Sequence, residues 1–169
     1  MKMYFMSVQA CNNRGKAETI SGLKQVKNKY KDRGFTITYY HGGNEFNHLH
    51  AYLEPAHLHT CAANEHIWDI ERSIWTIKEQ VRCVYQSTPY KKFTKLMTRY
   101  LVQDIITCLN MFPSKNGISI NLRPEIIILV SPNPDENKLK ITFGAYAQVY
   151  IGTNKSTKQR TVGAIALTP

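Results

Sequence analysis

The sequence predicts an α/β fold followed by a small β-rich module, and three observations support this prediction. The first forty residues alternate strand-like and helix-like patterns, the middle of the chain carries two long helix patterns, and residues 140–169 return to strand-like alternation. Apolar residues recur every three or four positions in a helix and every second position in a half-buried strand. We therefore expect an α/β domain over residues 1–112, a linker over 113–139 and the β module over 140–169.

The first predicted elements are a strand, a helix and a second strand. Residues 3–8, with the sequence MYFMSV, are apolar and strand-like. Apolar residues recur at helical spacing over residues 16–33, and Gly34 follows as a typical stop signal. Residues 35–40 alternate and are aromatic or β-branched, which predicts a strand. The polar stretch HGGNEF, residues 41–46, then predicts a turn at the end of this strand.

The middle of the chain is mainly helical. Residues 46–54 predict a short helix and residues 58–62 a short strand, before two long helices over 67–85 and 92–111. The helix over 67–85 carries the strongest pattern, which predicts a buried apolar stripe. Its members are Ile67, Ile70, Ile74, Ile77, Val81 and Val84.

Turn-rich sequence follows residue 112 and separates several strand-like segments. The segment EIIILV, residues 125–130, has the length of a buried strand. Residues 140–151 and 160–167 alternate and are predicted strands of the β module.

The charge of the chain favours a polyanionic partner. Lys and Arg number 22 against 12 Asp and Glu, which gives a net charge of +10. Such a charge attracts nucleic acid through its phosphates without selecting a sequence. No apolar run is long enough to span a membrane, and no signal peptide is recognised, so we expect a nuclear or cytoplasmic chain that is not secreted and has no membrane partner.

One predicted helix combines a carboxylate with two cations. At about 100° per residue, Glu71, Lys78 and Arg82 fall on one face beside the apolar stripe. A carboxylate and two cations placed in this way can hold a metal ion and a nucleic-acid backbone. The same spacing is typical of a solvated, charged helix surface, and the helix alone favours that interpretation over a metal or nucleic-acid site.

Several segments, taken in order, resemble the integrase region of copia-like retrotransposon polyproteins. They are GFTITYYHGGNEF, NEHIWDIERSIWTIKEQVRC, FGAYAQVY and RTVGAIALTP. The resemblance implies a ribonuclease-H-like core, which is a mixed sheet flanked by helices, here lacking its first strand. It also implies a catalytic triad of two Asp and one Glu that holds two divalent metal ions, usually magnesium, for DNA strand transfer.

The resemblance places the third carboxylate of the triad on Glu71 and the second on Gly43. The first Asp of the family lies on a strand before residue 3, and residues 1–10 contain no Asp or Glu. Because magnesium needs several oxygen ligands, Glu71 alone is expected to hold it weakly at best. Glu45 is expected to interact with a helix start rather than with a metal ion. We therefore expect a vestigial, catalytically inactive integrase domain without a functional metal cofactor.

Residual, nonspecific nucleic-acid binding is the activity that we expect to survive. The candidate contacts are Lys24, Lys27, Lys31, Lys78 and Arg82. The alternative is a zinc-binding or protein-interaction module built on the histidines of residues 41–66, although their spacing matches no common zinc site. Without the missing strand, residues 3–8 are expected to present an exposed edge that favours self-association.

Overall fold

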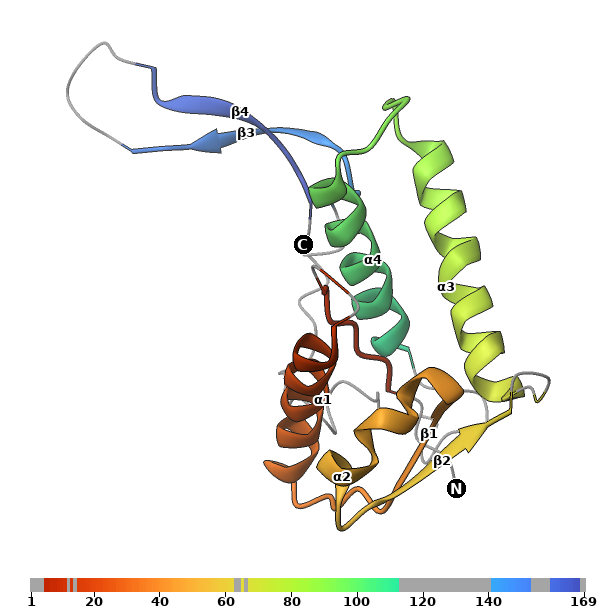
Figure 1. Cartoon of the computed structure of the whole chain (residues 1–169). Coiled ribbons are helices and arrows are strands. Elements are labelled where there is room, and N and C mark those ends of the chain that lie inside the picture. The colour runs from red at the N-terminus through yellow and green to blue at the C-terminus, as the bar shows by residue number, and fades with distance from the viewer. Residues whose placement is uncertain are drawn as a thin grey trace.

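The computed structural model describes residues 5–11, 13, 15–62, 65, 67–112, 141–152 and 159–167. These residues form a mixed α/β structure with four α-helices, one 3-10 helix and two separate two-stranded sheets (Figure 1). The helices are α1 (Lys16–Lys31), the 3-10 helix η1 (Asn44–Leu49), α2 (His50–Leu53), α3 (Trp68–Ser87) and α4 (Lys95–Asn110). The strands are β1 (Tyr39–Gly43), β2 (His57–Cys61), β3 (Tyr146–Tyr150) and β4 (Thr161–Ile165).

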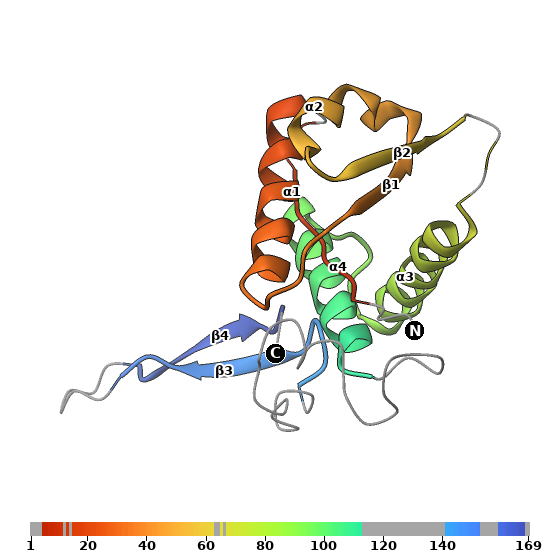
Figure 2. The same cartoon turned by 90° about the horizontal axis from the view of Figure 1, so that it is seen from below.

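The first sheet consists of β1 and β2, which run parallel. Their register runs from Tyr39 opposite His57 to Gly43 opposite Cys61. Parallel neighbours cannot be joined by a tight turn. The chain therefore returns through η1 and α2, which confirms the short helix and the second strand that the sequence predicts. Both α1 and α2 lie on the same side of the two strands (Figure 2).

The core is formed by two groups of aliphatic side chains. The crossover between β1 and β2 buries Leu49, Leu53 and Ala56, and α4 buries an apolar stripe. That stripe comprises Leu101, Ile105 and Ile106, and Met111 is buried just beyond the helix. Burying one such side chain stabilises a fold by about 1.5–3 kcal/mol, so these residues anchor the crossover and α4.

The strand predicted over residues 3–8 is wrong for its described part, which begins at Phe5 and is not a strand. The amide of Met6 donates to Oδ1 of Asn110 (2.9 Å), and Nδ2 of Asn110 donates to the carbonyl of Met6 (2.7 Å). These backbone groups are thus satisfied by a side chain of α4 instead of a neighbouring strand. The edge expected to favour self-association is therefore absent from the described part of this segment.

The strand predicted over residues 35–40 begins later than expected, at Tyr39. Gly34 has a φ of 76° and ends the helix as predicted. The amide of Phe35 donates back to the carbonyl of Tyr30 (3.0 Å), and the two rings lie 6.3 Å apart. Phe35 therefore packs against the end of α1. The strand also ends later than expected, so His41, Gly42 and Gly43 belong to β1 instead of the turn.

The predicted buried stripe of α3 is wrong, although the helix itself is confirmed. No residue of α3 is buried, and Ile70 and Ile74 are 39% and 46% exposed. The neighbouring helix that α3 contacts is α4 (Figure 1). The stripe stays partly exposed because a single neighbouring helix covers only part of an apolar face. The sequence could not predict this, since the helical spacing of the isoleucines does not show how many elements pack against them.

The predicted β module contains the antiparallel hairpin of β3 and β4, which projects from the helices (Figure 1). The hydroxyl of Tyr90 donates to the carbonyl of Gly144 (2.9 Å), and the rings of Phe93 and Phe143 lie 6.0 Å apart. These contacts join the α3–α4 loop to the start of the hairpin.

The predicted linker and the EIIILV segment lie outside the described residues. No helix in the described part of the chain is long and apolar enough to cross a membrane.

Candidate nucleic-acid interface

Gly43, the position of the expected second carboxylate, is the last residue of β1. Its φ of −69° and ψ of 165° are extended, a conformation that any residue adopts. The backbone therefore does not require glycine here. Gly43 also directly precedes η1 and, having no side chain, provides no side-chain cap for that helix.

The side chain of Glu45 occupies the space beside Gly43. A Cβ atom added to Gly43 would stand only 2.7 Å from the carboxyl carbon of Glu45. Glu45 also lies in the first turn of η1, as expected, where a carboxylate interacts favourably with unpaired backbone amides. A carboxylate is thus present near the expected position, but it comes from residue 45.

Magnesium does not fit the carboxylates that the described residues supply. Glu71 lies in the first turn of α3 together with Asp69. Across the described residues, no group of three His, Cys, Asp or Glu side chains is arranged to hold a metal ion. Magnesium requires near-octahedral oxygen coordination, and a two-metal site needs several shared carboxylates.

The basic residues predicted on α3 are only partly available to a partner. Lys78 is exposed. The guanidinium of Arg82 forms an ion pair with Glu79, one turn earlier on the same helix. Because Glu79 offsets the charge of Arg82, Lys78 and Arg82 together present about half of the positive charge that they would present without it.

The lysines of α1 form a more continuous basic surface. At 100° per residue, four lysines fall within a sector of about 80°, and Ile20 is the only other residue of α1 in that sector. We call this the α1 lysine face; it comprises Lys16, Lys24, Lys27 and Lys31. The sequence predicts three of these four lysines as contacts, Lys24, Lys27 and Lys31. It missed Lys16, although helical periodicity places Lys16 on the same face.

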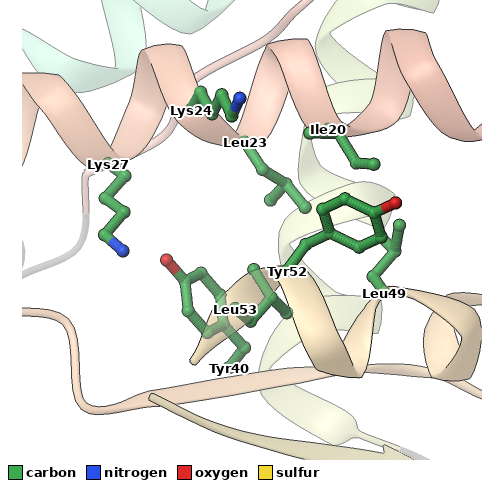
Figure 3. Close-up of a pocket in the computed structure, with 8 residues that line it drawn as sticks. All are labelled: Ile20, Leu23, Lys24, Lys27, Tyr40, Leu49, Tyr52 and Leu53. Carbon is green, nitrogen blue, oxygen red and sulfur yellow. The ribbon is translucent and has the colours of Figure 1, made fainter. Parts of the chain in front are cut away.

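The α1 lysine face borders a small cavity between α1 and α2. The cavity encloses about 100 Å³ and is lined by Ile20, Leu23, Lys24, Lys27, Tyr40, Leu49, Tyr52 and Leu53 (Figure 3). At its rim, Nζ of Lys16 lies 4.8 Å from the centre of the Tyr52 ring. The cavity therefore has an apolar floor and a cationic rim.

Tyr40 contributes an unusual polar group to this cavity. Its hydroxyl is buried and has no hydrogen-bond partner among the described residues. Burial also raises the pKa of Tyr40, so the hydroxyl keeps its proton and remains a donor. Figure 3 shows the Tyr40 hydroxyl and the Lys27 ammonium at the same end of the cavity. The alternation of side chains along the predicted strand could place Tyr40 on the side of β1 that faces this cavity. It could not reveal that the hydroxyl is unpaired.

The histidines separate into different surroundings. His41, His57 and His59 gather beside Tyr39 on the β1–β2 pair. His48 instead lines a cavity between residues 7–13, α1 and η1, while His50 is exposed at the start of α2. His66 lies outside the described residues. The predicted histidine cluster is therefore only partly brought together.

No family model, no curated protein and no solved structure matches the chain. Its function must therefore be inferred from its own residues.

Proposed function

We propose that this chain is a vestigial integrase catalytic domain of a copia-like retrotransposon that binds nucleic acid nonspecifically and lacks strand-transfer activity. The α1 lysine face, beside the unpaired hydroxyl of Tyr40, is the observation that carries the proposed binding.

The order of elements supports the proposed family. A helix precedes β1, a short helical crossover leads to the parallel strand β2, and a long helix with Glu71 in its first turn follows. In the proposed core, Gly43 stands where a carboxylate would extend from the end of β1. A ribonuclease-H-like arrangement of the whole core remains part of the proposal.

The proposed loss of catalysis follows from the ligands that remain. Two-metal strand transfer needs one ion to activate the attacking oxygen and a second to stabilise the leaving oxygen. Glu71 is the one family carboxylate that the resemblance retains, and Glu45 lies over the glycine that replaces another. These residues do not supply the ligands for two ions.

The proposed binding surface has dimensions that suit a nucleic-acid backbone. From Lys16 to Lys31, α1 extends about 22 Å, at 1.5 Å per residue. This length corresponds to about six base-pair steps of 3.4 Å. The ammonium groups would contact phosphates along this length, and the Tyr40 hydroxyl would donate to a phosphate oxygen that enters the cavity.

Charge-neutralising variants of α1 test this proposal. Lys24→Gln and Lys27→Gln are expected to weaken binding to a labelled duplex, measured by fluorescence anisotropy. Lys29→Gln is the matched control, because Lys29 is exposed on the same helix and loses the same charge but points away from the α1 lysine face. Equal losses in all three variants would show that only net charge matters and that this face is not the interface.

A zinc-binding or protein-interaction module remains the second candidate. The gathering of His41, His57 and His59 favours its interaction form, whereas no three such side chains in the described residues are arranged as metal ligands. Zinc ions added during thermal unfolding would raise the melting temperature if these histidines bind the metal. An unchanged melting temperature with saturating zinc would exclude the metal-binding form of this candidate.

A further inference from the structure

The two faces of the β1–β2 pair have different surroundings. Side chains alternate between the faces of a strand. Tyr40 and Leu58 point to the inner face, which packs on the leucines of α1, η1 and α2. The outer face carries Tyr39, His41, Gly43, His57, His59 and Cys61. Four of these six residues have aromatic or imidazole rings.

The four rings form a continuous row. The centres of the Tyr39 and His57 rings lie 5.4 Å apart, Tyr39 and His59 lie 5.7 Å apart, and His41 and His59 lie 5.4 Å apart. The planes within these pairs are inclined by 30°, 36° and 18°, respectively. The rings therefore share a similar orientation. We call this row the ring ladder.

The ring ladder is open to solvent. Tyr39 is 56% exposed, and the three histidines are also exposed. Both faces of a parallel sheet are normally covered, so an uncovered outer face is unusual. An exposed ladder of rings on such a face is a surface to which a partner can bind.

The chemistry of the outer face selects the kind of partner. None of its six residues is a carboxylate, and the chain carries a net charge of +10, so a polyanion is not repelled. None of the six is aliphatic, which disfavours an apolar helix as the partner. Planar rings instead stack well on the faces of nucleobases, and stacking tolerates any sequence.

We propose that the ring ladder stacks on unpaired bases of single-stranded nucleic acid. In a duplex the faces of the bases are covered by their neighbours, so only an unpaired strand exposes them to Tyr39 and His59. This inference rests on the proposed nucleic-acid binding and adds to it a preference for single strands. The ladder contributes stacking, whereas the α1 lysine face contributes contacts with phosphates.

Ring-removing and ring-retaining variants test the inference. Binding to a labelled oligothymidine of about 15 nucleotides and to a duplex of equal length is measured by fluorescence anisotropy. Tyr39→Ala and His59→Ala are each expected to weaken single-strand binding about fivefold or more, the low end of the range for a base stacked on a ring. His59→Phe keeps a ring without ring nitrogens and is expected to retain binding. Duplex binding should not change.

Tyr146→Ala is the matched control, because Tyr146 is also an exposed tyrosine of a strand but lies in the hairpin, outside the ladder. Circular dichroism of each variant confirms that it is folded, and His41→Ala provides a second ladder position if Tyr39→Ala does not fold.

The possible results separate the two proposals. Wild-type affinity in Tyr39→Ala, His59→Ala and His41→Ala overturns the ring ladder as a binding site. Equal losses in His59→Phe and His59→Ala also overturn stacking, since they indicate a role for the imidazole nitrogens. If duplex binding still responds to Lys24→Gln in these cases, the proposed function survives. If the unmodified chain binds neither form of nucleic acid, both proposals fail.

Discussion

Replacing Gly43 with Asp restores the carboxylate that the family resemblance expects at the end of β1. The extended backbone of Gly43 accepts a side chain without strain. The three atoms nearest to a Cβ at this position all belong to the carboxylate end of Glu45, a side chain that is flexible enough to move away. The substitution should therefore fold, and its consequences should be electrostatic.

The expected change in stability is small because two effects oppose each other. Asp at position 43 can cap the amides at the start of η1, which no side chain caps now, and this stabilises the fold by a few tenths of a kcal/mol relative to Gly. Repulsion between the new carboxylate and Glu45 costs about 1 kcal/mol at 4 Å in water. Gly43→Asn provides the cap without the charge, so it should be the more stable variant.

Urea denaturation of Gly43→Asp, Gly43→Asn and Gly43→Asp/Glu45→Gln measures this balance. The additional Glu45→Gln change should bring the stability of Gly43→Asp close to that of Gly43→Asn. A DNA nicking and strand-transfer assay with magnesium should detect no activity in any variant, because residues 1–10 still supply no carboxylate.

Two results would refute this reasoning. If Gly43→Asp were the most stable variant whether or not Glu45 is present, the Glu45 carboxylate could not lie beside position 43. If Gly43→Asp alone gave metal-dependent strand transfer, the assignment of the missing carboxylates would be wrong.

Three further predictions concern polar groups that are buried or half-buried. Asn110→Ala should destabilise the fold by about 2 kcal/mol in urea denaturation, because the amide and carbonyl of Met6 lose their partner; an unchanged unfolding midpoint would show that residues 5–11 are not held by α4. Tyr40→Phe should keep or raise the melting temperature, since the lost hydroxyl is unpaired, yet weaken DNA binding; full DNA affinity would remove Tyr40 from the interface. Burial raises the pKa of Asp104, so its protonated form favours folding at low pH, and this contribution is lost as the pH rises through the raised pKa. Asp104→Asn should therefore melt higher than the wild type at neutral pH, and the gap should close in acid; a gap that is independent of pH would contradict this cause.

The sequence predicts those elements whose signals are local. α1 and α4 were predicted within a few residues because apolar residues recur at helical spacing, and Gly34 ends α1 through its positive φ. The short crossover and β2 were also predicted. By contrast, the described part of residues 3–8 pairs with Asn110, and no local pattern indicates that partner.

The candidate sites likewise combine residues that the sequence predicts with features that depend on tertiary structure. Lys24 and Lys27 were predicted from charge and helical spacing, and the structure places both beside one cavity. The unpaired hydroxyl of Tyr40 depends on tertiary packing. The ring ladder depends on the register of β1 against β2, which places Tyr39 opposite His57 and cannot be determined from either strand alone.

The salt dependence of duplex binding tests the central claim, charge-driven nucleic-acid binding, most directly. If the four lysines of the α1 lysine face contact phosphates, the logarithm of the association constant should fall with the logarithm of the salt concentration, with a slope of about −3 to −4. A slope near zero, or no binding at low salt, would contradict the proposed function.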